Sequence, residues 1–258
     1  MAIFRQLADA EAREEPVALA MVIASQGSTP RHEGSKMLVF ADGRIEGSVG
    51  GGELESRVIE EALGALRDGR PRRLHYSLVD PARGDVGVCG GQVEVYVEPV
   101  LPRSEVVVIG GGHVGNAVTH LAHWLGFRVV VADDRAEFCT PEANPDADAF
   151  VTGPMSELPQ KMAITPRSYL VLTTRGSSVD VPGLPALLAS PAAYIGVIGS
   201  KRRWSVTRKS LLDAGISQEA LERVHTPIGI EIQAETPEEI AVSILAEIIQ
   251  LSNHRPND

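Results

Sequence analysis

The chain has 258 residues, of which 43% are hydrophobic and 22% charged, so its composition is that of a globular protein rather than a disordered or fibrous one. Its formal net charge of −10 argues against a surface that attracts nucleic acid or anionic lipid. The longest apolar run, residues 17–24, is far shorter than the roughly 20 residues that span a bilayer, and its upstream flank is acidic where a signal peptide is basic. Two cysteines make no disulfide framework. We therefore expect a soluble cytoplasmic protein without nucleic-acid or membrane partners.

The first hundred residues are expected to form a mixed α/β domain. Apolar residues recur at helical spacing from Leu54 to Leu66, with charged residues available for the solvent side. β-branched or alternating apolar residues indicate strands before and after that helix. We predict helices over residues 3–13 and 53–66, strands over residues 17–25, 36–40, 44–48, 72–79 and 92–98, and a loop over residues 80–91.

Residues 99–103 mark the boundary between two domains. Pro99 and Pro102 interrupt ladder hydrogen bonding and stiffen an extended connection. Beyond them, short apolar runs alternate with stretches long enough for helices, which is the pattern of a Rossmann-like, doubly wound parallel sheet. The predicted strands are residues 105–109, 128–132, 149–152, 169–173 and 194–198. The chain is interpreted as an N-terminal mixed α/β domain, 1–100, followed by a Rossmann-like domain, 104–258.

The last predicted helix has the clearest start signal in the chain. Thr236 can cap it, Pro237 suits its first position, and Glu239 completes a capping box. The apolar stripe of this helix consists of Ile240, Ile244, Leu245 and Ile248.

A glycine-rich loop follows the first predicted strand of the second domain. Gly110, Gly112 and Gly115 occupy the glycine places of GxGxxG, with His113 between them, and the loop opens a helix. Such glycines let a pyrophosphate approach backbone N–H groups at the positive end of the helix. Asp133 follows Gly115 by 18 residues, near the spacing of about 20 expected for an acid that binds a ribose hydroxyl. The loop predicts a nucleotide-like ligand, and a tight turn whose glycines serve packing alone is the alternative.

Positive charge follows the ends of three predicted strands in the second domain. The five cations are Arg135 after the second strand, Arg175 after the fourth, and Lys201, Arg202 and Arg203 after the fifth, where they follow Ser200. Because ligands of open parallel sheets bind beyond the carboxyl ends of the strands, the cations predict a local anion site. An ordinary basic surface helix is the alternative for the last two arginines.

The first domain carries a glycine loop of its own. Gly50, Gly51 and Gly52 follow a predicted strand and open a helix, so their backbone N–H groups could cradle an oxyanion. Glu53 and Glu55 in the first turn of that helix compete for the same helix dipole.

Arg31 and Cys89 lie in further loops of the first domain. Arg31 ends the segment 27–31 and can pair with a phosphate, although the residues alone favour structural turns both here and at the Gly50 loop. Cys89 is flanked by small residues, so its thiol could be reached by a large ligand or by a thiol of another protein. Burial as a small hydrophobic residue is the alternative for Cys89.

No sequence pattern indicates catalysis. His120 and His123, three apart on one predicted helix, make a poor metal site without a third ligand. The sequence contains no nucleophile elbow, no HExxH pair and no paired-cysteine zinc motif. We therefore expect a binding protein without catalytic residues.

Several ordered motifs resemble those of the xanthine dehydrogenase accessory proteins of the XdhC/CoxI family, and the likeness spans nearly the whole chain. The motifs are Gly27–Arg31, Gly47–Glu55, Cys89–Gly91, Gly110–Gly115 with Asp133–Arg135, Tyr194–Ser200, and Pro227–Ile230 leading to Thr236–Ala241.

The resemblance implies a molybdenum-cofactor chaperone. Proteins of this family bind the pyranopterin cofactor, hold it while its terminal sulfido ligand is installed, and insert it into a molybdenum hydroxylase. The implied partners are an apo-hydroxylase of the xanthine dehydrogenase type and a cysteine desulfurase, and a homodimer is expected.

The resemblance also implies roles for individual residues. It places Arg31, the Gly50–Gly52 loop and the Gly110–Gly115 loop at the cofactor, with Cys89 facing molybdenum or the incoming sulfur. Some relatives carry a cysteine where Glu53 stands and a histidine where Ser177 stands, so no thiol or imidazole role is carried over to those two positions.

Two alternatives come from other functional classes. An NAD(P)-dependent oxidoreductase would use the same glycine loop and Asp133, but it needs a proton donor beside the nicotinamide, and the sequence offers no convincing Tyr-x-x-x-Lys or His-Asp pairing. An interaction scaffold with a vestigial pocket is the other alternative.

Overall fold

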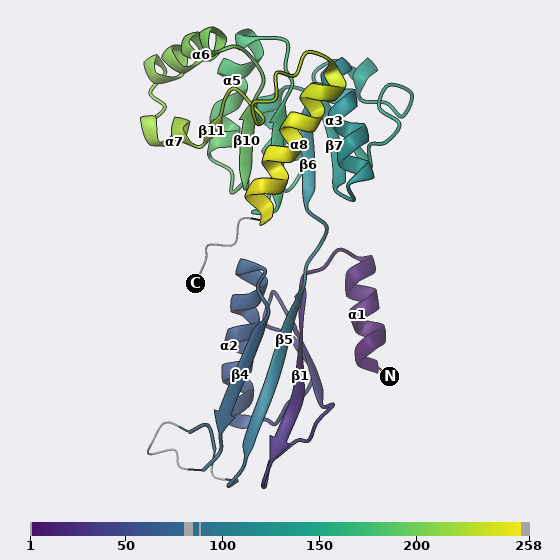
Figure 1. Ribbon diagram of the computed structural model, residues 1–258, viewed down its shortest axis with the longest axis vertical. Coiled ribbons are helices and arrows are strands. Elements are labelled where there is room, and N and C mark those ends of the chain that lie inside the picture. The colour runs from purple at the N-terminus through teal and green to yellow at the C-terminus, as the bar shows by residue number, and fades with distance from the viewer. Residues whose placement is uncertain (1, 80–84, 88, 254–258) are drawn as a thin grey trace. The chain divides into compact units, whose positions relative to one another are not determined.

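The structure is a computed structural model that describes residues 2–79, 85–87 and 89–253. The chain divides into two compact units, Met1–Pro102 and Arg103–Asp258, each with its own sheet (Figure 1). Part of the predicted loop 80–91 lies outside the described residues. The predicted order of an N-terminal mixed α/β region followed by a Rossmann-like region is confirmed.

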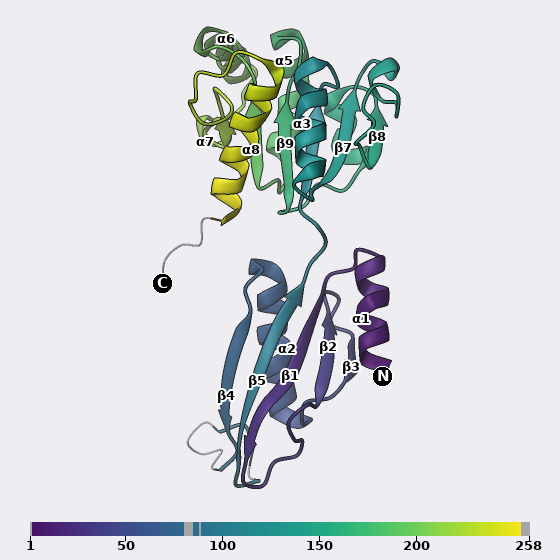
Figure 2. The same ribbon diagram turned by 45° about the vertical axis from the view of Figure 1, so that its right-hand side comes forward.

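The first unit is built on an antiparallel sheet with the strand order β3-β2-β1-β5-β4 (Figure 2). Its strands are β1 (Val17–Gln26), β2 (Lys36–Phe40), β3 (Ile45–Gly47), β4 (Arg72–Ser77) and β5 (Gln92–Val100). The helix α2 (Gly52–Asp68) packs on the face that carries Met37 and Val39, and α1 (Ala2–Ala12) packs on Leu38, which faces the other side. Each face of β2 is therefore covered by one helix.

The buried stripe of α2 explains why the predicted helix forms. Leu54, Val58, Ala62 and Ala65 are all buried against the sheet, at a spacing of three or four residues. The helix ends at Gly69, whose left-handed conformation lets its N–H bond the carbonyl of Ala65 at 2.8 Å.

β5 runs two residues beyond the predicted strand 92–98. Pro99 pairs with Ala18 on β1, whereas the pairing of β5 with β4 ends at Val97. A proline is tolerated where a strand has a neighbour on only one side, because no second ladder needs its missing N–H. The first proline of the expected connection is thus part of a strand.

The sheet of the second unit is parallel throughout, with the order β11-β10-β9-β6-β7-β8. Its strands are β6 (Glu105–Ile109), β7 (Arg128–Asp133), β8 (Ala149–Thr152), β9 (Ser168–Leu172), β10 (Tyr194–Val197) and β11 (Val224–His225). Starting at β8, this is the 3-2-1-4-5-6 order of dinucleotide-binding Rossmann folds. The doubly wound sheet is confirmed, and the two-residue strand β11 is an addition that the sequence pattern did not indicate.

Helices cover both faces of the parallel sheet (Figures 1 and 2). The helices α3 (His113–Trp124) and α8 (Pro237–Asn253) pack on the face that carries Val106 and Val108. The helices α5 (Ser177–Leu188) and α6 (Lys201–Asp213) pack on the face that carries Val107 and Ile109. The short elements are η2 (Ala136–Phe138), η3 (Met155–Glu157), α4 (Leu158–Lys161) and α7 (Gln218–Glu222). In the described part of the chain, no helix has the length and apolar character needed to cross a membrane.

The predicted start of α8 is confirmed in detail. The N–H of Glu239 donates to the Thr236 hydroxyl at 3.2 Å, and the N–H of Thr236 donates to the Glu239 carboxylate at 3.1 Å, so the capping box is closed. The stripe residues Ile244, Leu245 and Ile248 are buried against the sheet.

Candidate functional site

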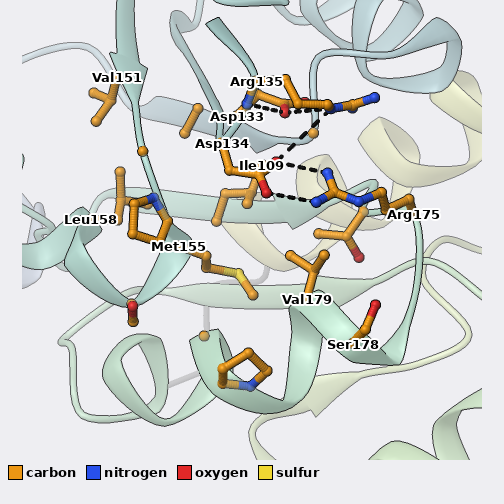
Figure 3. Close-up of a pocket in the computed structure, with 18 residues that line it drawn as sticks. Ile109, Asp133, Asp134, Arg135, Val151, Met155, Leu158, Arg175, Ser178 and Val179 are labelled. Atoms are coloured by element: carbon orange, nitrogen blue, oxygen red, sulfur yellow. Dashed lines mark hydrogen bonds and ion pairs between the residues drawn. The ribbon is translucent and has the colours of Figure 1, made fainter.

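A cavity of about 360 Å³ lies at the carboxyl edge of the parallel sheet (Figure 3). The strand order reverses between β6 and β9, and ligands of open α/β sheets bind beyond the strand ends at such a point. Residues that follow the four strands around it line the cavity: Gly110 after β6, Asp133–Arg135 at the end of β7, Gly153–Ser156 after β8, and Thr174 and Arg175 after β9.

One side of this cavity is apolar. Val151, Met155 and Leu158 line it, and the last two are buried. In Figure 3 these three side chains lie on the other side of the cavity from Arg175. Val179 on α5 adds to the apolar lining. A surface of this kind suits a ring system, with polar groups left to fix its orientation.

The charged rim of the cavity contains a bidentate ion pair. The guanidinium of Arg175 donates to both carboxylate oxygens of Asp134, at 2.7 and 2.6 Å (Figure 3). The side chains are 49% and 36% exposed. An exposed pair of this kind contributes about 0–1 kcal/mol, so a competing anion can displace Asp134 at little cost.

Asp133, the predicted ribose acceptor, is already fully engaged. Its carboxylate accepts the N–H of Gly111 at 3.0 Å, and it accepts three donors of Arg135, namely the backbone N–H, Nε and Nη2, each at 3.0 Å. The Asp133 side chain is 2% exposed. The guanidinium of Arg135 also lies 4.0 Å from the centre of the Phe138 ring. These contacts hold the end of β7 against the glycine loop.

The pair between Asp134 and Arg175 gives a testable pH dependence. The hydrogen bonds from Arg175 lower the pKa of the Asp134 carboxyl to about 2. A lowered pKa in the folded state means that the pair stabilises the fold fully above about pH 4 and is lost as the pH falls from about 4 towards 2.

We expect Arg175→Gln to raise the pKa of Asp134 towards its ordinary value of about 3.9. The measurement is an NMR titration of the side-chain carboxyl carbon. Asp42 is the control, since its pKa is lowered by Arg44 in the other unit, and its titration should not change. An unchanged Asp134 titration would contradict the pairing.

Arg203 stabilises the fold and does not line the cavity. It donates to the carbonyl of Thr174 at 3.2 Å, to the Thr174 hydroxyl at 2.7 Å and to the Asp180 carboxylate at 2.7 Å. Asp180 is completely buried. Ser200 caps α6 by accepting the N–H of Arg203 at 3.2 Å, and Lys201 is exposed at the start of that helix. The predicted cluster of cations therefore contains three arginines that are each paired with an aspartate.

The glycine loop is shaped by close packing. Gly110 has a φ of 113°, and a Cβ there would lie 2.7 Å from the carbonyl oxygen of Thr173. A Cβ at Gly115 would overlap the carbonyl oxygen of Gly110. A Cβ at Gly112 would meet no atom within 4 Å. The packing alternative thus accounts for the first and last glycines of the motif, and Gly112 is the place where space for a ligand is open.

Gly112 and His113 line a second cavity, of about 830 Å³, between the N-terminal ends of α3 and α8. Asn116 on α3 and Pro237 on α8 also line it. The predicted site residues of the second unit are therefore divided. Gly110, Asp133, Arg135 and Arg175 line the cavity at the carboxyl edge, while Gly112 and His113 line this one.

The Gly50 loop of the first unit holds a carboxylate of its own chain. One oxygen of Glu55 accepts the Ser48 hydroxyl at 2.6 Å and the N–H groups of Val49 and Gly51, each at 3.2 Å. Gly51 and Gly52 have φ values of 75° and 61°. The oxyanion cradle that the sequence suggested is present, and Glu55 occupies it.

Three motifs of the first unit meet at one end of its sheet. A Cβ at Gly91 would lie 2.6 Å from the carbonyl oxygen of Gln26, and one at Gly50 would lie 3.1 Å from Pro30. Cys89 next to this contact is exposed and has a free thiol, so it is not the small buried hydrophobic residue of the alternative interpretation. Arg31 is also exposed. Arg31, Gly50–Gly52 and Cys89 all belong to the first unit.

The first histidine of the predicted pair on α3 is held by a carboxylate. His120 is paired with Asp146 at 2.7 Å. Within residues 2–79, 85–87 and 89–253, no group of three or more histidine, cysteine or acidic side chains could hold a metal ion.

The segment after β8 contributes site residues that were not among those predicted from the sequence. Gly153, Met155 and Ser156 line the cavity at the carboxyl edge, together with Asp134 and Ser178. Ligands of open parallel sheets bind beyond the carboxyl ends of the strands, and residues 149–152 were predicted to form such a strand. The sequence therefore held a signal for the residues that follow it.

Comparisons with known proteins match both units. Residues 106–248 match the model of the XdhC Rossmann domain, and residues 10–77 match the model of the XdhC and CoxI family. Over its full length the chain is similar to a solved structure described as a xanthine dehydrogenase from Bacillus halodurans, with a TM-score of 0.54, 24% identity, and coverage of 100% of this chain and 97% of the other. That likeness shows a shared fold.

Three curated relatives are similar in sequence. The uncharacterized protein YqeB of Escherichia coli (strain K12) is 37% identical over 99% of this chain and 47% of its own length. A probable xanthine dehydrogenase subunit of Bacillus subtilis (strain 168) is 31% identical over 60% of this chain and 45% of its own length. The molybdenum cofactor insertion chaperone PaoD of Escherichia coli (strain K12) is 24% identical over 93% of this chain and 85% of its own length. The chain spans about half the length of the first two relatives.

Proposed function

Because this chain belongs to the XdhC and CoxI family, we propose that it binds a molybdenum cofactor as cargo and inserts it into a molybdenum hydroxylase of the xanthine dehydrogenase type. Two relatives support this proposal by their names, one a molybdenum cofactor insertion chaperone and the other a probable xanthine dehydrogenase subunit. In this proposal the protein is an accessory factor without catalytic residues.

The observation that carries the proposal is the cavity at the carboxyl edge of the parallel sheet. The cargo is a phosphorylated, anionic and oxidation-sensitive pterin. The apolar side of the cavity, with Met155 and Leu158, can shelter a ring, and the guanidinium of Arg175 offers two parallel N–H donors to a phosphate. A cavity of about 360 Å³ is within the size range of small-molecule sites.

We also propose that the cofactor receives its terminal sulfido ligand while it is bound to this protein. The protein would keep the cofactor while a cysteine desulfurase supplies its terminal sulfido ligand, with the exposed thiol of Cys89 facing molybdenum or the incoming sulfur. A homodimer in the cytoplasm is the form proposed for this task. Cys89→Ser should then impair transfer of active cofactor, and unchanged reactivation of an apo-hydroxylase would refute the role of the thiol.

Anaerobic gel filtration tests cargo binding directly. The full chain is mixed with molybdenum cofactor, and pterin fluorescence is measured in the protein fraction. We expect retention by the wild type and about a tenfold weaker interaction for Arg175→Gln, since a hydrogen bond to a charged group contributes about 1.5–3 kcal/mol.

Arg202→Gln is the matched control, because this arginine is exposed on α6 and does not line the cavity. It should retain the cofactor as the wild type does. No retention by the wild type, or equal losses in both variants, would contradict the proposal.

A further inference from the structure

The helix α6 carries an exposed basic surface. Its buried residues are Thr207 and Leu211. The side of the helix that faces away from them carries two lysines and two large apolar residues, which we call the basic patch: Lys201, Val206, Lys209 and Leu212. Val206 is 56% exposed and Leu212 is 36% exposed. The first turn of α6 contains no acidic residue, although the positive end of a helix disfavours a cation such as Lys201. The charge of Lys201 therefore does not stabilise this helix.

An exposed acidic surface lies in the segment between β11 and α8. It consists of two glutamates and two large apolar residues, which we call the acidic patch: Ile230, Glu231, Ile232 and Glu235. Ile230 is 39% exposed and Ile232 is 44% exposed. Residues 230–242 contain no lysine or arginine. The acidic patch thus repeats the composition of the basic patch with the opposite charge.

The two patches leave neighbouring strands of the parallel sheet. The helix α6 follows β10, the acidic patch follows β11, and these two strands pair in parallel, so both patches start from the same edge. In Figures 1 and 2 the segment before α8 runs on the side of the unit where α6 lies. In the part of the chain that the structure describes, Lys201, Lys209, Glu231 and Glu235 form no ion pair. The charges of the two patches therefore do not neutralise each other within one chain.

A second copy of this chain fits both patches at once. Neighbouring patches of opposite charge are self-complementary about a two-fold axis between them, because the basic patch of each copy then meets the acidic patch of the other. The exposed valine, leucine and isoleucines would add an apolar contact at each of these two places. A nucleic acid or an anionic membrane fits less well, since it would bring negative charge next to Glu231 and Glu235 on a chain whose net charge is −10.

From these surfaces we infer that two copies associate through the second unit, with Lys201 and Lys209 of one copy against Glu231 and Glu235 of the other. The inference rests on the homodimer included in the proposed function and assigns a surface to it. This surface lies beside the candidate site, because Arg203 in the first turn of α6 donates to Thr174, which lines the cavity at the carboxyl edge. The patch residues themselves do not line that cavity, so association and cofactor binding can be measured separately.

Charge reversal tests the interface by sedimentation equilibrium of the full chain. One variant combines Lys201→Glu with Lys209→Glu, and the other combines Glu231→Lys with Glu235→Lys. We expect the wild type to be a dimer and the dimer dissociation constant of each variant to rise at least about tenfold, because like charges then meet at both contacts. An equimolar mixture of the two variants should form dimers with about the affinity of the wild type, since opposite charges meet again.

The matched control combines Arg5→Glu with Arg67→Glu, two exposed cations of the first unit, and should dimerise as the wild type does. A monomeric wild type, variants that stay dimeric, or equal weakening in the control overturns the inference. A mixture that stays monomeric overturns it as well, whereas recovery of dimers in the mixture shows that both variants are folded. A monomeric wild type that binds poly-glutamate through the basic patch would show that an acidic partner is the occupant instead.

Pterin fluorescence of the same samples separates this inference from the proposed cargo. A monomer that retains the molybdenum cofactor overturns the interface and leaves cofactor binding standing. A dimer that behaves as expected but retains no cofactor supports the interface and contradicts the proposed cargo.

Discussion

Replacing Arg203 with alanine is expected to lower the free energy of unfolding of the second unit by about 3–5 kcal/mol. Asp180, its ion-pair partner, is completely buried, so the substitution leaves an uncompensated carboxylate in the interior. The Thr174 hydroxyl and carbonyl lose their guanidinium donors at the same time. Few single substitutions cost so much, and a buried charge without a counter-charge is among the causes that do; the hydrogen bond that the Thr174 hydroxyl donates to Asp180 remains but supplies no positive charge.

Arg202→Ala is the matched control for this prediction. Arg202 is the neighbouring arginine on the same helix, and it is exposed, so its removal should change stability by less than about 0.5 kcal/mol. Urea unfolding followed by tryptophan fluorescence is the measurement, because Trp124 and Trp204, the two tryptophans of the chain, both lie in the second unit. Similar losses in the two variants would contradict the assignment of Arg203 to the interior of the fold.

Gly115→Ala is the second substitution with a large expected effect, a loss of about 3 kcal/mol. Helix propensity alone predicts a gain of about 1 kcal/mol for this change inside α3. A methyl group at Gly115 would overlap the carbonyl oxygen of Gly110, which is backbone and cannot swing aside. Because of this overlap, we expect Gly115→Ala to lower the free energy of unfolding rather than raise it.

Gly112→Ala in the same loop is the control for Gly115→Ala. A Cβ at Gly112 meets nothing within 4 Å, and its φ of −72° is accessible to alanine, so the loss should stay below about 1 kcal/mol. The measurement is again urea unfolding followed by tryptophan fluorescence. Equal stability of the two variants would show that the turn can widen and that its glycines are not required for packing.

The fold could be predicted from local patterns because these patterns agree with the tertiary structure. Apolar runs of four to six residues between amphipathic stretches gave the five main strands of the parallel sheet, and the signals at Thr236 and Glu239 gave the start of α8. Two features had no such signal. The strand β11 is only two residues long, and α5 contains Pro182 and Pro185, which argue against a helix in sequence.

The candidate site was predicted in part. The rule about strand ends brought Gly110, Asp133, Arg135 and Arg175 to one edge of the sheet, and all four line the same cavity. The sequence could not show which residues form ion pairs with each other, because side-chain geometry determines the ion-pair partner of each charged residue. Asp133 and Asp134 are neighbours in the chain, yet they pair with different arginines. Asp134 pairs with Arg175 across the switch point, and Asp133 pairs with Arg135 two residues away. The buried Asp180 belongs to the helix with two prolines, so its pairing with Arg203 had no sequence signal.

In the proposed function, the cavity at the carboxyl edge of β6, β7, β8 and β9 holds a molybdenum cofactor. Its most direct test is an anomalous difference map at the molybdenum edge, from crystals of the full chain grown anaerobically with the cofactor. We expect cofactor density in the cavity lined by Met155 and Arg175, with the guanidinium of Arg175 moved from Asp134 to the phosphate. Density in the cavity between α3 and α8 instead, or a molybdenum peak with no density at Arg175, would contradict it.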